Sequence, residues 1–297
     1  MNLTALHYSQ RTCVMSLLLL FTLSACGNVQ NDQSNSFDDL LLTLEQELGG
    51  TIGVFAMDTT TGSELAYRAD ERFAMASTFK PLLVAAVLAE VDAGTLNLEE
   101  RYGIEDVDMQ SYSPVVGKLA ANETISLSEL CAAAITISDN TATNMLLDLI
   151  GGPDELTQFL RRSGDDMTRL DRNEGELNSN IKGDERDTST PRAMTHSVYR
   201  LLNSDTLSSA SKRRITEWLI ASQTGFSRLR AGLPPGWTVG DKTGMGANGA
   251  ANNIAIAWPP GRKPVVMTVF MSWSEADVDT LNAAHARIAA RIAESFE

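Results

Sequence analysis

The sequence predicts an α/β (α+β) protein in which strands from both ends of the chain form one sheet, with a helical domain inserted between them. Strand-like runs occur near both ends, whereas the middle of the chain carries apolar stretches at helical spacing. The 297 residues are enough to bury a sizeable core in one large domain or two smaller ones.

The N-terminal segment, residues 1–25, has the features of an export signal. Its apolar run at 13–23 is shorter than the roughly 20 residues that a membrane span needs. The run ends in Leu23-Ser24-Ala25-Cys26, which resembles the lipobox of bacterial lipoproteins, where a diacylglycerol alkylates the cysteine thiol. We therefore expect an exported protein whose only membrane attachment is a lipid anchor at Cys26; an ordinary cleavage site is the alternative. The polar residues 26–36 are expected to form a flexible tether.

The first elements of the exported chain are predicted to be a helix and a hairpin. Residues 37–48 place leucines at helical spacing and stop at Gly49-Gly50. The runs at 51–58 and 64–68 flank turn residues, which predicts two paired strands.

Helices are expected through the middle of the chain, so residues 69–220 are assigned to an all-helical domain. Residues 165–187 are polar without a convincing period and are expected to form a loop of that domain. Residues 37–68 and 221–297 together are assigned to a discontinuous α/β domain. The expected helices after the hairpin cover 77–91, 127–137, 141–150, 154–162, 191–202, 208–221 and 275–295, and the remaining strands cover 237–243, 253–258 and 265–272.

Composition excludes several classes of function. The 24 basic and 38 acidic residues give a net charge of −14, which disfavours nucleic acid as a partner. The three cysteines and three histidines lie far apart, so neither a Cys/His metal site nor a disulfide scaffold is expected. A Ser-His-Asp triad would have to use His196 or His285, because His7 lies in the leader.

Three short motifs could carry chemistry. Ser77-Thr-Phe-Lys80 places a hydroxyl at the start of an apolar helix and a lysine on the same face, within reach of its proton. Ser138-Asp139-Asn140 lies between two helical runs, and Lys242-Thr243-Gly244 ends a strand. Taken singly, the first is equally typical of a helix cap with a solvated lysine. The other two are more typical of a cap between helices and of an exposed lysine on an edge strand. Two other S-x-x-K matches, at 179–182 and 209–212, lie in polar surroundings and are not expected to function.

Taken in this order, the motifs resemble those of the class A serine β-lactamases. The resemblance runs from about Phe37 to the C-terminus and includes Tyr112-Ser-Pro114 and the LDRNEGELN segment at 170–178. It implies the β-lactamase/transpeptidase-like fold, with an antiparallel sheet flanked by helices and an inserted all-helical domain. It also implies a monomer, without a cofactor or metal, that hydrolyses the β-lactam ring of penicillins and cephalosporins and so confers resistance.

The resemblance further implies a role for each motif residue. Ser77 would attack the lactam carbonyl and form an acyl-enzyme. Either Lys80 or Glu174 acting through a water would take its proton, a choice that is disputed for the family. Ser138 would pass a proton to the leaving nitrogen, and the backbone N–H groups of Ser77 and Met245 would form the oxyanion hole. Substrate binding would fall to Tyr112, Asn140, Lys242, Thr243, Gly244 and Met245.

Glu174 and Asn178 separate a hydrolase from a protein that only binds. They stand at i and i+4, so one helical turn would aim both side chains at one water for deacylation. The alternative for so acidic a segment is a solvated loop. Arg172 and Asp187 match the positions of a loop-closing ion pair in relatives.

The sequence also departs from the family pattern. Gly175 follows Glu174 where many relatives have proline, which leaves the path of the loop open. Met245 replaces a small or hydroxyl residue; it keeps the backbone donor but adds bulk. Ala251 stands near where several relatives carry an arginine, whereas Arg228 matches the alternative arginine of another subgroup. We expect Arg228 to contact the substrate carboxylate, the alternative being a surface arginine.

Two other functions share part of this pattern. A penicillin-binding D-Ala-D-Ala peptidase or transpeptidase would use the same acylation chemistry, but Glu174 and Asn178 argue against it. A non-catalytic lipoprotein that binds cell-wall fragments or β-lactams would not need the intact set of Ser77, Lys80 and Glu174.

Overall fold

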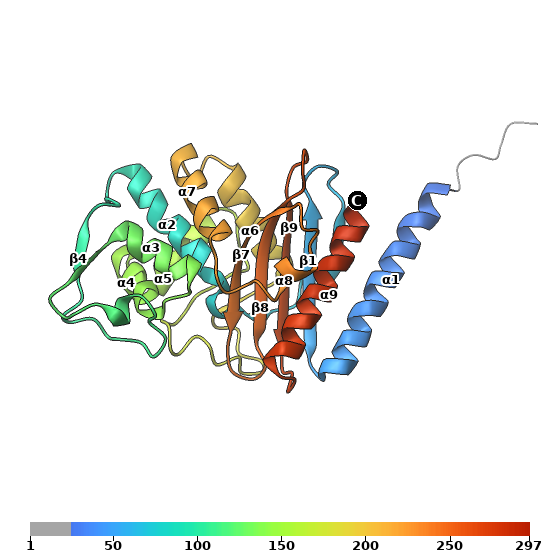
Figure 1. Cartoon of the computed structure of the whole chain (residues 1–297), viewed down its shortest axis with the longest axis horizontal. Coiled ribbons are helices and arrows are strands. Elements are labelled where there is room, and N and C mark those ends of the chain that lie inside the picture. The colour runs from blue at the N-terminus through green and yellow to red at the C-terminus, as the bar shows by residue number, and fades with distance from the viewer. Residues whose placement is uncertain (1–24) are drawn as a thin grey trace, which may run out of the picture.

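A computed structural model of the chain describes the backbone from Ala25 and the side chains from Phe37. The predicted signal at 1–24 and the side chain of Cys26 therefore lie outside the described residues. Helix α1 (Ala25–Leu48) begins earlier than expected, and the segment predicted to be a flexible tether is helical. Within that segment the only glycine is near its start and no proline occurs, so a helix formed by 37–48 can extend through it. Figure 1 shows the N-terminal part of α1 running beyond the sheet.

The central sheet has five antiparallel strands in the order β2-β1-β9-β8-β7. Strand β1, from the N-terminal part, pairs along its whole length with β9, from Thr51 opposite Ser272 to Asp58 opposite Val265. Both ends of the chain therefore share one sheet, as predicted, and the predicted fold class is confirmed. The strands are β1 (Thr51–Asp58), β2 (Glu64–Tyr67), β7 (Thr238–Met245), β8 (Ala251–Trp258) and β9 (Val265–Ser272).

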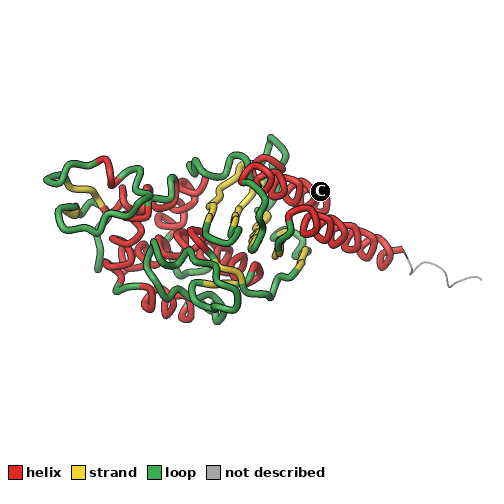
Figure 2. The backbone as a smooth tube through the Cα atoms, turned by 90° about the horizontal axis from the view of Figure 1, so that it is seen from below, coloured by secondary structure: helices red, strands yellow, loops and turns green. Residues whose placement is uncertain are grey.

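Helices cover both faces of this sheet (Figures 1 and 2). Along β9, Val269 and Met271 belong to a core shared with α1 and α9 (Val278–Phe296), whereas Val266 and Phe270 belong to a second core shared with the helical part. Successive side chains of a strand point to opposite faces, so a strand buried on both sides is mostly apolar. This explains why β9 is apolar except at Thr268 and Ser272.

The helical part is built around α2, which contacts five other helices. Its first nine residues, from Lys80 to Leu88, are all buried. Capping side chains start the neighbouring helices: Ser126 forms a capping box before α3, and Asp139 accepts a hydrogen bond from the first turn of α4. The helices are α2 (Lys80–Ala93), α3 (Leu127–Thr136), α4 (Asn140–Ile150), α5 (Pro153–Arg162), α6 (Pro191–Asn203), α7 (Ser209–Ile220) and α8 (Leu229–Gly232).

The structure differs from the sequence prediction at short elements. Ser77 lies in a 3₁₀ turn (Ala76–Phe79) before α2, rather than in the helix itself. Two small strand pairs were not predicted, because elements of two or three residues are too short to show alternation. They are β3 (Phe73–Ala74) with β6 (Thr188–Ser189), and β4 (Arg101–Gly103) with β5 (Thr124–Ser126). The domain boundaries at 69 and 220 stay predictions.

Candidate active site

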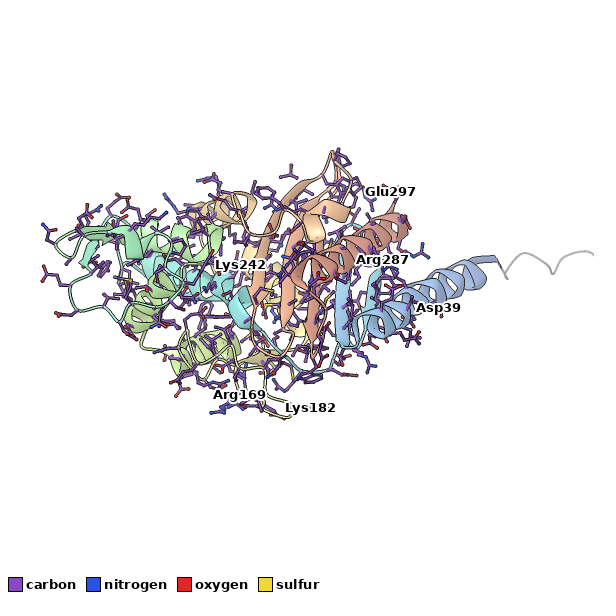
Figure 3. The ribbon with its side chains drawn as sticks, turned by 60° about the horizontal axis from the view of Figure 1, so that its bottom comes forward. Asp39, Arg169, Lys182, Lys242, Arg287 and Glu297 are labelled. Atoms are coloured by element: carbon purple, nitrogen blue, oxygen red, sulfur yellow. The ribbon has the colours of Figure 1, made fainter. Side chains whose placement is uncertain are left out.

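The three motifs meet where the β7 edge of the sheet contacts the helical part, as the position of Lys242 in Figure 3 illustrates. The 3₁₀ turn that carries Ser77 packs directly against β7. A Cβ at Gly244 would lie 2.9 Å from the carbonyl oxygen of Met75 and 3.1 Å from the backbone nitrogen of Ser77. Glycine at this position therefore allows β7 to approach the turn closely.

Lys80 is completely buried at the centre of the cluster. Its Nζ lies 2.9 Å from Glu174 Oε1 and donates to the carbonyl oxygen of Ser138 at 2.9 Å and to Asn140 Oδ1 at 2.7 Å. Burial lowers the pKa of Lys80, although the Glu174 carboxylate opposes this shift. The S-x-x-K, S-D-N and loop residues are thus joined through one ammonium group.

Glu174 is also buried and connects the nucleophile candidate to the loop. Ser77 Oγ donates to Glu174 Oε1 at 3.3 Å, and Asn178 Nδ2 donates to Glu174 Oε2 at 2.8 Å. The predicted i, i+4 pair therefore forms. Asn178 Oδ1 is buried and has no hydrogen-bond partner among the described residues. The carboxylate and this amide can together hold one water.

A second buried lysine lies on the other side of Ser138. Lys242 Nζ donates to Ser138 Oγ at 3.0 Å and to the carbonyl oxygen of Thr243 at 2.8 Å, while Lys80 Nζ lies 3.1 Å from the same hydroxyl. Burial, followed by the charge of Lys80, lowers the pKa of Lys242 well below its ordinary value. Ser138 has a φ of 65°, a strained conformation for a residue with a side chain. Its hydroxyl is therefore held between two ammonium groups.

Asn144 is a positioning residue that the sequence analysis missed. Its Oδ1 accepts from the backbone nitrogen of Glu174 at 2.8 Å, and its Nδ2 donates to the carbonyl oxygen of Glu174 at 3.4 Å. Asn144 stands four residues after Asn140 on α4, so helical spacing places both on one face. This spacing is the signal that could have identified it.

Asp139 ties the segment that carries Tyr112 to α4. Its Oδ1 accepts from the backbone nitrogen of Ala142, and its Oδ2 accepts from those of Val115 at 2.8 Å and Val116 at 3.0 Å. The backbone nitrogen of Asn140 donates to the carbonyl oxygen of Tyr112. The Tyr112 ring is half exposed.

The two residues expected at the loop neck are paired. Arg172 Nε donates to Asp187 Oδ2, and Asp187 Oδ1 accepts from the backbone nitrogens of Asp171 and Arg172. The carbonyl oxygen of Asp187 accepts from the backbone nitrogen of Met75, two residues before Ser77. Within the loop, Gly175 has a φ of 101°, which favours glycine. The neck therefore fixes the loop to the segment that carries the nucleophile candidate.

Arg228 is 4% exposed, so it is not a surface arginine. Its Nε donates to Asn282 Oδ1 at 2.8 Å, and its Nη1 donates to the carbonyl oxygens of Gly244 at 3.1 Å and Asn252 at 2.7 Å. Its Nη2 lies 2.7 Å from Met245 Sδ. Burial lowers its pKa to about 10, which leaves the guanidinium charged at neutral pH. A fixed cation thus lies beside the end of β7.

Comparison with known proteins agrees with this geometry. The chain matches the family model described as "Beta-lactamase enzyme family" over residues 35–296. β-Lactamase AST-1 of Nocardia asteroides is 46% identical, and the alignment covers 83% of this chain and 79% of AST-1. β-Lactamase CTX-M-25 of Escherichia coli is 42% identical, and the alignment covers 89% of this chain and 88% of CTX-M-25. An ancestral class A β-lactamase of Gram-negative bacteria is 50% identical with a TM-score of 0.85, covering 88% of this chain and all of its own. The putative class A enzyme PenP from Rhodopseudomonas palustris has a TM-score of 0.84 at 46% identity, covering 88% and 99%.

The fold and these comparisons define a hydrolase whose candidate site groups a serine with buried lysine and glutamate side chains. The chain belongs to the class A β-lactamases. These enzymes open the β-lactam ring through a serine acyl-enzyme, which confers resistance, and they are generally exported. Among the described residues, none of the helices combines the length and the hydrophobicity that a transmembrane span requires.

Asp187→Ala tests whether the neck holds the loop. The substitution leaves two backbone N–H groups and Arg172 without their acceptor, so unfolding free energy should fall by roughly 2 kcal/mol or more. Urea denaturation measures this loss, and limited proteolysis should cut within 165–187 faster than in the parent. Asp166→Ala removes an exposed carboxylate from the same loop and should change neither result. Equal behaviour of the two variants would contradict the role of the neck.

Proposed function

We propose that Ser77 is the nucleophile, supported by its position beside Glu174 and Lys80 at the centre of the site. Its Oγ forms a bond to the lactam carbonyl carbon. The hydroxyl proton passes either to Glu174, directly or through a water, or to Lys80. The backbone N–H groups of Ser77 and Met245 stabilise the charge that develops on the carbonyl oxygen. The close packing of β7 at Gly244 against the turn that carries Ser77 supports this pairing.

Ser138 completes acylation by giving its proton to the lactam nitrogen as the C–N bond breaks. Its hydroxyl lies within 3.1 Å of the Nζ atoms of both Lys80 and Lys242. Either ammonium group can therefore return a proton to Ser138 Oγ. The two cations also favour the transient negative charge on Ser138 Oγ. Acylation thus requires no histidine.

Glu174 and Asn178 carry the second half of the reaction. The carboxylate takes a proton from a water that attacks the ester carbonyl, and that proton passes to Ser77 Oγ as the ester bond breaks and the opened product is released. The single observation that carries this proposal is the buried contact among Glu174, Ser77 and Asn178. Neither the peptidase nor the binding lipoprotein requires such a contact.

Substrate recognition is assigned to the groups around the β7 edge. Lys242 and Thr243 attract the substrate carboxylate, and Arg228 adds a third interaction from beneath Gly244. Asn140 binds the side-chain amide of the substrate, and Tyr112 flanks the entrance. The buried charge of Arg228 and its contact with the carbonyl oxygen of Gly244 support its assignment.

Glu174→Ala should convert turnover into a trapped acyl-enzyme. Lys80 remains as a base for acylation, whereas the substitution removes Glu174, the base for deacylation. Intact mass after benzylpenicillin addition should show a lasting adduct of one penicillin, and kcat should fall by about 100-fold or more. Glu176→Ala, which removes an exposed carboxylate two residues later, should turn over like the parent.

The same mass measurement on the parent protein separates the three functions. Fast turnover with little lasting adduct indicates a β-lactamase, a stable adduct indicates a peptidase, and no adduct indicates a binding protein. Unchanged turnover in Glu174→Ala would contradict its role in deacylation.

The low pKa of Lys242 predicts an early alkaline limit of activity. As pH rises through this lowered pKa, the ammonium loses its proton and its attraction for the substrate carboxylate, so kcat/KM should fall below the pH at which an ordinary lysine titrates. Lys242→Arg keeps the charge at all these pH values and should move the limit upward. A limit at the same pH in both proteins would assign it to another group.

We also propose that the enzyme is a monomer anchored by lipid at Cys26. Cys26→Ser should abolish fatty-acid labelling and move the enzyme from the membrane fraction to the soluble fraction. Cys13→Ser, within the leader, should keep both the label and the membrane location. Labelling that survives in Cys26→Ser would contradict the anchor.

A further inference from the structure

Arg228 uses most of its hydrogen-bonding capacity on fixed protein groups. A guanidinium has five N–H bonds, of which one belongs to Nε and two to each terminal nitrogen. Asn282 Oδ1 and the carbonyl oxygens of Gly244 and Asn252 take three of them through Nε and Nη1. Only Nη2 is left to bind a ligand, and it lies 2.7 Å from Met245 Sδ.

Met245 combines a fixed backbone with a movable side chain. It is the last residue of β7 and pairs with Ala251 in the sheet. Its side chain is 44% exposed and has three rotatable bonds. The thioether can therefore leave Nη2 without any movement of the strand.

We propose that the Met245 thioether caps Arg228 in the substrate-free enzyme and is displaced by the substrate carboxylate, which makes Met245 a specificity-determining residue. This inference rests on the proposed role of Arg228. Thioether sulfur is a weak hydrogen-bond acceptor, whereas a carboxylate forms a stronger, charge-assisted bond with a guanidinium. An anionic substrate can thus replace the cap, while a neutral one cannot.

A thioether that caps Arg228 should affect the kinetics differently from a side chain that only occupies space. The cap stabilises only the free enzyme, so its removal should raise kcat/KM and leave kcat unchanged. The gain should also depend on Arg228, because without the guanidinium the sulfur has nothing to cover. A purely steric side chain would act in the same way whether or not Arg228 is present.

The test is a double-mutant cycle with Met245→Leu and Arg228→Ala, measured with benzylpenicillin. Leucine keeps a similar volume but has no acceptor. Met245→Leu should raise kcat/KM about threefold in the parent, a change typical of losing one weak hydrogen bond, and should have no effect in Arg228→Ala. Met109→Leu, the same change at another exposed methionine, should leave kcat/KM unchanged in both backgrounds.

Other outcomes would contradict either the cap or the role of Arg228. If Met245→Leu has no effect, or the same effect with and without Arg228, the cap does not exist although Arg228 can still bind the carboxylate. If Arg228→Ala itself leaves kcat/KM unchanged, the proposed role of Arg228 fails first. In Glu174→Ala, the ε-methyl NMR resonance that Met245→Leu removes should shift on acylation by benzylpenicillin; an unshifted resonance would contradict displacement.

Discussion

The buried ion pair between Lys80 and Glu174 is the interaction on which the site depends. Transferring two charges out of water costs several kcal/mol per ion, and their attraction offsets this cost only when further hydrogen bonds satisfy both groups. Ser138 and Asn140 supply acceptors to the lysine, and Asn178 donates to the carboxylate. The S-D-N turn and the loop therefore hold both charges in place in the substrate-free protein.

The loop at 165–187 contains little regular structure of its own, so its position comes from a few polar contacts. Arg172 and Asp187 close its neck, Asn144 holds the backbone of Glu174, and the carbonyl oxygen of Asn178 accepts from the backbone nitrogen of Ala247. These contacts join the loop to α4 and to the β7–β8 turn, and the hydrogen bond from Met75 to the carbonyl oxygen of Asp187 joins it to the segment before Ser77. The Glu174 carboxylate is thus positioned by contacts with both the sheet and the helical part.

Periodicity and motif order predicted the fold class, most element bounds and the residues that meet in the site. Strands such as β9 are buried on both faces, and α2 lies at the centre of the helical part, so both appear as long apolar runs. Properties that depend on several segments at once could not be predicted. The support of Glu174 by Asn144 and the burial of Arg228 arise from tertiary packing, and the helical path of 26–36 arises from propagation of a neighbouring helix.

The pairing of β1 with β9 has a consequence for how the enzyme assembles. Thr59, just after β1, donates to the carbonyl oxygen of Pro264, which is 205 residues away, so the sheet closes through contacts distant in sequence. Contacts this distant in sequence carry a larger loop-closure cost, so topology slows the completion of the sheet. Lys242 joins Ser138 only when β7 takes its place in that sheet. Under the proposed mechanism, acylation by a β-lactam therefore requires a completed sheet, and chains that have not yet placed β7 should not react.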